Sequence, residues 1–187
     1  MKKNGFTLIE VLVALVLVGV AFMGMAKLLF ESRKQIHEVQ QRSIALSLVN
    51  DMIGRMTANP QGLSNYHNTS ITAITLAGKN CQADSTCTAA EMAAYDLQEW
   101  AESLVGSSVK KGSGNDAVNV GGLVSPVGCI TVVNNAVTLS IAWRGKQAQT
   151  ETTDRAAKTC GKDNANFTQV ADNDLRRLLE VTTTIGS

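Results

Sequence analysis

A long apolar run begins at the sixth residue of the chain. No residue from 11 to 26 is charged, and Lys27 is the next charge along the sequence. Counted from Phe6 to Phe30, the run has 25 residues, which as a helix would be about 37 Å long. This length is sufficient for a bilayer core of about 30 Å, so we predict a membrane-spanning helix. One carboxylate, Glu10, lies near its start.

Helical periodicity continues beyond the apolar run. Asn59-Pro60 ends the pattern, because the residue before a proline disfavours helical geometry. The sequence therefore predicts one helix over residues 6–57, about 78 Å long, apolar all round in its first half and amphipathic in its second. A membrane span followed by a separate helix would give the same buried stripe. That stripe consists of Ile36, Val39, Leu46, Val49, Ile53 and Met56.

The middle of the chain predicts one short helix between two polar segments. Residues 61–80 are polar and are expected to form an irregular connector. Thr88 and Glu91 have the spacing of a capping box, which predicts a helix start, and Gly106 predicts its end. Residues 106–116, rich in glycine and serine, are expected to form a flexible linker or exposed loop.

After residue 116 the periodicity changes from helical to alternating. Asn134-Asn135 predicts a type I′ hairpin turn, because asparagine tolerates positive φ. Residues 175–185 alternate as a strand, and the polar residues 147–173 are expected to form loops and an edge strand. The hairpin turn brings Val132 to face Val137 and Ile130 to face Leu139; Ile141 and Trp143 extend this face, and Thr138, Ser140 and Arg144 lie on the other.

Four cysteines, all located after the apolar run, indicate an oxidising compartment. The positive-inside rule places Lys2 and Lys3 in the cytoplasm and the long C-terminal part outside, which is the orientation that disulfides require. Four cysteines allow three pairings. Sequence proximity favours one bond between Cys81 and Cys87 and another between Cys129 and Cys160. The first bond would pin the entry to the short helix.

Chain length and net charge limit the fold classes and the binding functions that fit this sequence. The 187 residues suit one compact domain plus an anchor. We predict an α+β fold, with one long N-terminal helix packed on an antiparallel sheet and a short disulfide-pinned helix in the connecting region. A formal charge of +1 gives no argument for nucleic acid.

Candidate chemistry is sparse. We expect His67 to lie in a solvated loop. Neither His37 nor His67 has a second potential ligand at metal-binding spacing. The five residues between Cys81 and Cys87 are a wide gap for zinc. The sequence has no nucleophile elbow, phosphate loop or paired-carboxylate motif. We therefore expect no enzymatic activity, metal or cofactor.

The N-terminal segment has three interpretations. It can be an ordinary signal anchor, or a secretory signal peptide cut after Gly24-Met25-Ala26. The third interpretation rests on the order of two lysines, Gly5, Phe6 and Glu10, which resembles the class III signal of type IV prepilins and pseudopilins. The resemblance implies cleavage between Gly5 and Phe6 by a prepilin peptidase, N-methylation of Phe6, and retention of the apolar segment.

The same resemblance implies that Glu10 acts in assembly, and there is a physical reason for such a role. A lone carboxylate among packed apolar helices needs a partner, and the free amine of a neighbouring subunit's Phe6 can supply one. A subunit out of register would leave both charges unpaired. The pair can therefore select the docking position.

Two further blocks resemble the PilV-type minor pilins, the type IV pilus modification protein family. One is residues 50–60, at the end of the first helix, and the other is Cys87-Thr88 leading into residues 92–100. The resemblance implies a minor pilin that joins other minor pilins and the major pilin at the inner-membrane assembly platform. It would initiate or tip a fibre used for twitching motility, adhesion or DNA uptake.

The resemblance also implies boundaries and a location. We expect a leader over residues 1–5, a transmembrane and assembly half-helix over 6–30, an amphipathic half-helix over 31–57, and a periplasmic globular domain over 58–187. The chain would cross the inner membrane once, in contact with lipid, before it enters the fibre or its tip. Alternatives are a minor pseudopilin of a type II secretion system and a tethered module that binds DNA or a surface ligand.

Overall fold

The computed structural model describes residues 7–72, 79–82, 86–114 and 117–186. The chain forms two compact units, Met1–Val39 and Gln40–Ser187. Each unit is described by itself. The second unit contains the remainder of the long helix, a shorter helix and a four-stranded sheet.

The first helix, α1, is one continuous α-helix over Leu8–Ala58, with 51 residues. This confirms the predicted single helix. It ends at Asn59, whose backbone has left the helical region at φ −128° and ψ 60°, directly before Pro60. The proline ring clashes with helical geometry in the residue before it, so the sequence itself sets this end.

The buried face of α1 differs in part from the predicted stripe. Val49 and Met56 are fully buried as expected, but Ile36, Val39 and Leu46 are 53%, 68% and 48% exposed. The prediction followed the largest apolar side chains, whereas the buried face includes a small residue and a polar one, which carry little periodic signal. The buried positions are Gln41, Ala45, Val49, Met52 and Met56.

Gln41 is buried because both ends of its side-chain amide are bonded. Its Nε2 donates to the carbonyl oxygen of Gly122 at 3.5 Å, and its Oε1 accepts from the backbone N–H of Val124 at 3.1 Å. A buried amide without such partners would destabilise the fold. The contacts thus join α1 to the chain segment that precedes the strand Val127–Val133.

The second helix, α2, spans Ala89–Val105 as the sequence predicts. The side chain of Thr88 accepts from the backbone N–H of Glu91, and the Glu91 carboxylate accepts from the backbone N–H of Thr88 at 2.7 Å. Gly106 ends the helix at φ 64°, a left-handed conformation in which glycine has no steric penalty. The capping box and the C-cap are both confirmed.

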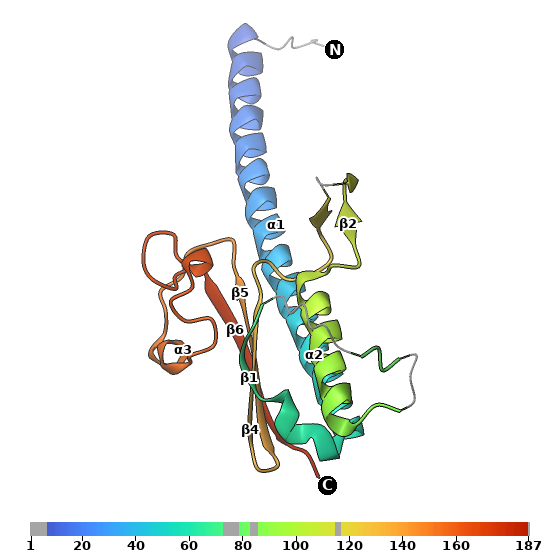
Figure 1. Ribbon diagram of the computed structural model, residues 1–187. Coiled ribbons are helices and arrows are strands. Elements are labelled where there is room, and N and C mark those ends of the chain that lie inside the picture. Colours follow the sequence, from blue (N-terminus) through green and yellow to red (C-terminus); the bar gives the residue numbers. More distant parts are fainter. Residues whose placement is uncertain (1–6, 73–78, 83–85, 115–116, 187) are drawn as a thin grey trace. The chain divides into compact units, whose positions relative to one another are not determined.

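The sheet is antiparallel with strand order β1-β4-β5-β6 (Figure 1). The predicted hairpin and its register are confirmed, since Val132 pairs with Val137. The predicted type I′ turn is wrong: of the two central residues only Asn134, at φ 53°, has a positive φ, as in a type II′ turn. Ile130 pairs with Leu139, also as expected. The predicted last strand is present as well. The strands are β1 (Asn68–Ile71), β4 (Val127–Val133), β5 (Ala136–Arg144) and β6 (Arg176–Thr184).

The predicted connector over residues 61–80 contains regular structure. A 3₁₀ helix, η1, covers Pro60–Tyr66, and β1 follows and pairs with β4. The side chain of His67 is exposed as expected, but its Nδ1 also accepts from the backbone N–H of Val132 at 3.2 Å. The strand was missed because its four residues show no apolar alternation, and pairing with β4 decides its conformation.

Two other loop predictions are also wrong in part. The expected loop over residues 106–116 contains β2 (Lys110–Lys111), which pairs with β3 (Val118–Asn119). Residues 147–173 are all described and contain no edge strand. They form loops with α3 (Thr153–Ala157) and a 3₁₀ helix, η3 (Ala165–Phe167).

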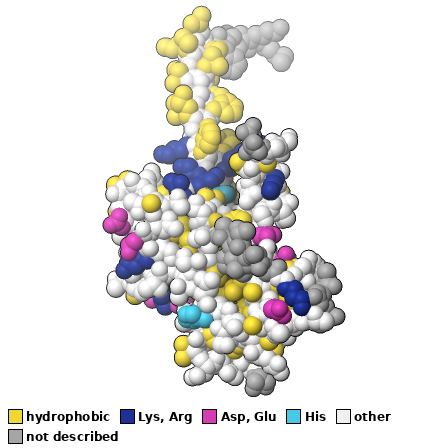
Figure 2. Space-filling model, viewed as in Figure 1, with side chains coloured by type: hydrophobic (Ala, Val, Ile, Leu, Met, Phe, Trp, Pro, Cys, Tyr) yellow, Lys and Arg dark blue, Asp and Glu magenta, His cyan; other side chains and the backbone are white. Residues whose placement is uncertain are grey.

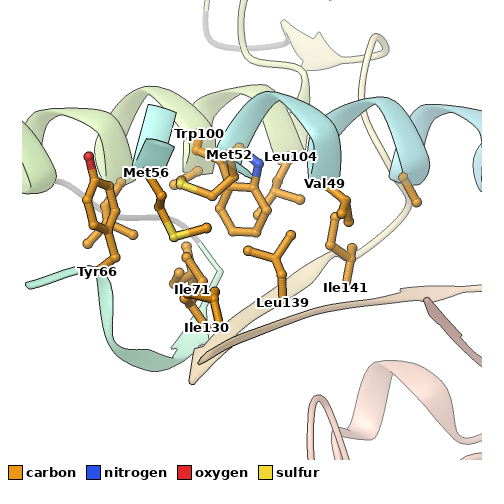
Figure 3. Packing of buried hydrophobic residues seen from close by; sticks show 14 of the residues in the cluster. Val49, Met52, Met56, Tyr66, Ile71, Trp100, Leu104, Ile130, Leu139 and Ile141 are labelled. Atoms are coloured by element: carbon orange, nitrogen blue, oxygen red, sulfur yellow. The ribbon is translucent and has the colours of Figure 1, made fainter. Parts of the chain in front are cut away.

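The main core lies between α1, α2 and one face of the sheet (Figure 3). Trp100 of α2 is fully buried, and its ring N–H donates to the Leu48 carbonyl of α1 at 2.8 Å. The two helices are therefore joined by a directed contact as well as by packing. The labelled core residues are Val49, Met52 and Met56 from α1, Trp100 and Leu104 from α2, Tyr66 from η1, and Ile71, Ile130, Leu139 and Ile141 from the sheet.

The opposite face of the sheet is also covered, which alternation in the sequence did not predict. Ser140, expected on a polar face, is only 5% exposed. Residues 145–175 fold back over this face and bury a second, smaller cluster. Its members are Val127, Cys129, Ala142, Cys160 and Phe167, with Leu178 packed against them.

Both disulfides have the pairing that sequence proximity favours. Cys81 is bonded to Cys87, and Cys129 on β4 is bonded to Cys160. The second bond closes a span of 31 residues and holds the 145–175 segment to the sheet. On the chain-entropy model, closing a loop of this length stabilises the fold by about 3–4 kcal/mol.

Arg176 holds the same segment from inside. Its guanidinium is fully buried and donates to the Glu151 carboxylate at 2.6 Å and to the carbonyls of Lys158 and Cys160 at 2.9 and 3.0 Å. A buried charge is tolerated only when it is paired and hydrogen-bonded in this way. Nearby, N–H groups of the backbone, Val170 above all, lower the pKa of the Asp174 carboxyl.

Gly128 is a test of how tightly this core is packed. A Cβ on Gly128 would lie 2.4 Å from the Trp100 ring, whereas a Cβ on Gly54, on the exposed side of α1, would meet nothing within 4 Å. We expect Gly128→Ala to destabilise the full chain by about 1–3 kcal/mol through overpacking. We expect Gly54→Ala to stabilise it by about 0.5–1 kcal/mol.

The measurement is the urea midpoint of the detergent-solubilised full chain with its disulfides intact, followed by the fluorescence of Trp100 and Trp143, both of which are buried. Equal midpoints for the two variants would show that the core accommodates an extra methyl group beside Trp100 without cost.

Candidate membrane and assembly segment

Residues 8–30 of α1 expose a long series of large apolar side chains, and Figure 2 shows this part of the helix as mostly apolar on the face in view. In the described part of the chain, α1 is the one helix that is long and apolar enough to cross a membrane, judged by length and composition alone. Its most apolar stretch has no buried residue. The large apolar side chains exposed here are Leu8, Ile9, Val11, Leu12, Val13, Leu15, Val16, Leu17, Val18, Val20, Phe22, Met23, Met25, Leu28, Leu29 and Phe30.

This surface exceeds what a monomeric soluble protein exposes. Contiguous apolar patches on such proteins rarely pass a few hundred Å² and otherwise mark a membrane or a protein partner. A helix that is apolar all round has no side suited to water, so lipid or other helices must cover it. This part of α1 is therefore stable only where lipid or other helices surround it.

Glu10 lies in the first turn of this apolar helix. Its backbone N–H donates to the Thr7 carbonyl at 3.1 Å, so the helix starts just before it. Among the described residues, the Glu10 side chain makes no hydrogen bond or ion pair. It lines a shallow apolar groove with Val11, Ala14, Leu15 and Val18.

A carboxylate in the first turn interacts favourably with the N-terminal end of the helix dipole. That interaction is small compared with the cost of an unpaired charge among apolar groups. In an apolar environment, the Glu10 carboxylate therefore needs a cation from outside this chain segment as its partner. The predicted cleavage site at Gly5 and Phe6 lies outside the described residues.

A polar network joins the C-terminal end of α1 to η1 and α2. Arg55 donates to Asp51 on the same helix at 3.0 Å and to Asp96 on α2 at 3.2 Å. The hydroxyl of Tyr66 donates to the other oxygen of Asp96. Asn59 donates to the Tyr66 hydroxyl at 3.2 Å and to the Ala89 carbonyl at 2.8 Å. The network thereby joins α1, η1 and α2.

The network shifts the proton affinity of two of its members. Burial raises the pKa of the Tyr66 hydroxyl, and its hydrogen bond to Asp96 raises it further. Burial lowers the pKa of Arg55, but hydrogen bonds and attraction to Asp51 and Asp96 outweigh this effect and raise it above its ordinary value. Both shifts favour the protonation states that the hydrogen bonds require.

A second polar site lies beside the first half of β6, and no motif in the sequence predicts it. A cleft of about 420 Å³ is lined by Arg42 of α1, Lys158, and residues 178–180 of β6, together with Thr152, Asp154 and Arg155. Lys158 Nζ donates to Glu180 at 2.6 Å, and Ser140 donates to the same carboxylate at 3.0 Å. In the described ranges, no group of three or more His, Cys, Asp or Glu could hold a metal ion.

Tyr66 makes the fold sensitive to alkaline pH. Because its pKa is raised above the ordinary value of 10.0, the folded chain binds this proton more tightly than the unfolded chain does. The contribution is complete below about pH 10 and is lost as the pH rises toward the folded pKa. We expect Tyr66→Phe to destabilise the chain at pH 8 by about 1–3 kcal/mol, because Asp96 loses a donor. Above pH 10 we expect the variant to lose less further stability than the unsubstituted chain, since it has no hydroxyl to ionise at this position.

Urea midpoints between pH 8 and pH 12 measure both effects, with Tyr95→Phe as the control. Tyr95 is the second of the two tyrosines, and its hydroxyl donates to Gln82 at 3.5 Å. An unchanged alkaline profile in Tyr66→Phe would contradict this role of the hydroxyl.

Two family models match the chain. Residues 1–26 match the prokaryotic N-terminal methylation motif, and residues 30–98 match a family described as Type IV pilin Tt1218. No curated protein and no solved structure matches the chain. The long apolar N-terminal helix, the antiparallel sheet and the disulfide pair fit the type IV pilin-like α+β fold. The two matches and the fold together support the identification of this chain as a type IV prepilin.

Proposed function

We propose that the protein is a minor pilin of the type IV pilus. It is stored in the inner membrane as a prepilin, processed and methylated at its N-terminus, and joins other minor pilins in a complex that initiates or tips the fibre. The observation that carries the proposal is the division of α1: its first part is apolar and uncovered with Glu10 unpaired in the first turn, and its second part forms the core of a folded domain. The assignment as a minor pilin is supported by the PilV-like blocks at residues 50–60 and 92–100.

The chain has four parts in this proposal. Residues 1–5 are the leader, residues 6–30 the transmembrane and assembly half of the helix, residues 31–57 the amphipathic half, and residues 58–187 the periplasmic domain. The lysines of the leader and the two disulfides support a periplasmic location of the domain. Removal of the leader deletes Lys2 and Lys3, so the formal charge changes from 17 − 16 = +1 to 15 − 16 = −1.

Cleavage creates the group that Glu10 needs. A cut between Gly5 and Phe6 leaves a free amine on Phe6, four residues before Glu10, and the amine of one subunit meets the carboxylate of its neighbour. In uncleaved subunits the corresponding amine is on Met1, five residues further from the helix. Processing therefore prepares the subunit for docking, and its absence keeps the prepilin in the membrane.

The charge pair is important because apolar packing alone hardly favours the fibre over the lipid bilayer. Lipid tails are as apolar as the side chains of a neighbouring helix, so transfer from bilayer to fibre gains little from the hydrophobic effect. The transfer depends on close packing and on pairing of polar groups. A misplaced subunit would leave two unpaired charges in an apolar environment, which costs several kcal/mol.

The partners in this proposal are the prepilin peptidase, other minor pilins, the major pilin, and the inner-membrane assembly platform. Membrane lipid covers the apolar helix before assembly. A minor pseudopilin of a type II secretion system would share the leader and the helix. The match to a model described as a type IV pilin favours the pilus.

Mass spectrometry of sheared surface pili tests processing and assembly together. We expect an N-terminal peptide that begins with methylated Phe6, at low abundance relative to the major pilin. A chain that is processed but confined to the membrane fraction would contradict the pilus assignment and favour the secretion system.

Substitution of Glu10 tests the assembly role separately. We expect Glu10→Ala to be cleaved and methylated normally, but to be reduced in sheared pili by about tenfold or more, because the neighbour's amine loses its partner. Glu31→Ala is the matched control, since Glu31 is an exposed carboxylate on the same helix that pairs with Lys34 at 3.5 Å. Immunoblots of the membrane and pilus fractions measure both variants, and normal incorporation of Glu10→Ala would refute the proposed pair.

A further inference from the structure

The two edges of the four-stranded sheet differ in how they are protected. At one edge, β1 has four residues, and its pairing with β4 shifts register between Asn68 and Ile71. At the other edge, β6 has nine residues and pairs with β5 in unbroken register from Arg176 to Thr184. Short strands and bulges are devices that prevent a sheet from pairing with another chain. The β1 edge has both devices, and β6 has neither of them and no proline.

The backbone of β6 has free groups along its outer side. Ile185 N–H donates to the Asn135 carbonyl at 2.9 Å, and Gly145 N–H donates to the Leu175 carbonyl at 2.8 Å. In an antiparallel pair the bonded residues alternate, so the odd-numbered residues of β6 face β5 and the even-numbered ones face outward. Within the described residues, the backbone groups of the outward-facing residues after Arg176 make no hydrogen bond. These residues are Leu178, Glu180, Thr182 and Thr184.

The side chains of this edge are suited to strand pairing. Leu178, Leu179 and Val181 are half-buried and retain contact with water at the edge. A strand added beside β6 would cover them. Residues 182–184 are three consecutive threonines, and β-branched residues are favoured in strands. The edge therefore offers both a hydrogen-bonding ladder and an apolar margin.

The charges at the start of the edge specify the added strand. The cleft described above contains three cations, Arg42, Arg155 and Lys158, and two carboxylates, Asp154 and Glu180. Lys158 is already paired with Glu180 at 2.6 Å, and Arg155 lies 3.8 Å from Glu151. Arg42 is exposed and has no ion pair or hydrogen bond among the described residues. The cleft favours a partner with a carboxylate that can reach Arg42.

A second copy of this chain fits the edge less well. Its own β6 would bring one carboxylate, Glu180, and that group is already held by Lys158 and by Ser140 at 3.0 Å. It would also bring another Arg42. A strand from a different protein can carry an acidic side chain without these constraints.

We propose that the outer edge of β6 binds an extended strand of another pilus subunit, and that an acidic side chain of that strand pairs with Arg42. Strand addition is a general mode of recognition in which backbone hydrogen bonds give affinity and side chains give specificity. The identity of the partner as a pilus subunit rests on the proposed function. The strand addition itself rests only on the sheet.

Photo-crosslinking of the full chain in its native cells tests the proposal. A photoreactive phenylalanine analogue is placed at Thr182 or Thr184 on the β6 edge, and at the exposed Ser70 on the β1 edge as a control. We expect adducts from positions 182 and 184 with one other protein, at partner residues two positions apart, because alternate residues of paired strands lie on one side. Position 70 should give no such pattern.

A matched pair of backbone variants separates strand addition from side-chain contact. Thr182→Pro removes an N–H that faces outward and is not used within the sheet, whereas Thr182→Ala keeps it. With the crosslinker at Thr184, we expect the adduct to fall about tenfold in Thr182→Pro, the effect of one lost hydrogen bond at the upper end of its range. It should be unchanged in Thr182→Ala.

Arg42 provides a second test that does not disturb the sheet. Arg42 is exposed on α1, so Arg42→Glu and Arg42→Lys should both keep the Cys129–Cys160 bond and the urea midpoint. We expect Arg42→Glu to lower the adduct and Arg42→Lys to preserve it. If Thr182→Pro impairs folding, this pair decides the question.

Four outcomes would overturn the proposal: adducts with a second copy of this chain alone, the same adducts from Ser70, full adduct yield in Arg42→Glu or in a folded Thr182→Pro, or no adduct from either edge position. Adducts are measured in the membrane and sheared-pilus fractions separately. Paired-strand adducts in the membrane with no chain in the pili would support the strand addition and contradict the proposed function.

Discussion

The structure depends on one helix having to satisfy two different surroundings. An apolar surface all round is stable only in lipid or among other helices. A folded domain needs a helix with one apolar face and one polar face. In α1 both requirements are met in a single 51-residue element. The change takes place where the fully apolar run gives way to charged residues such as Lys27 and Arg33, and the buried face that begins at Gln41 forms one wall of the main core.

Directed polar contacts determine how the domain is attached to that helix. Apolar packing tolerates small rotations of a helix, whereas hydrogen bonds with buried partners do not, because each lost partner leaves a costly unsatisfied group. Gln41, the Leu48 carbonyl and Arg55 all make such contacts along the buried side of α1, with the segment at Gly122, with Trp100 and with Asp96. These contacts therefore fix how residues 41–55 of α1 are rotated against α2 and the segment at Gly122.

The far side of the sheet is organised by a different principle. Residues 145–175 have little regular structure, and their own apolar content is low. They are held by the Cys129–Cys160 bond and by the buried Arg176, which satisfies the carbonyls of Lys158 and Cys160. A covalent bond and a charged side chain here replace a large core. With this face covered and β1 shortened, β6 remains as the open side of the sheet.

The sequence by itself determined the elements whose signals are local. The end of α1 before Pro60, the capping box of α2, the hairpin turn at Asn134 and the register of β4 with β5 follow from the preferences of a few neighbouring residues. The position of Glu10 could also be identified from the sequence, because it is a single carboxylate near the start of an apolar run. Tertiary structure decided the rest: which face of α1 is buried, that Asn68–Ile71 is a strand, that Ser140 is covered, and that Arg42 meets β6 in one cleft. These features depend on partners distant in the chain, and pairing between distant segments leaves little trace in the local pattern of either one.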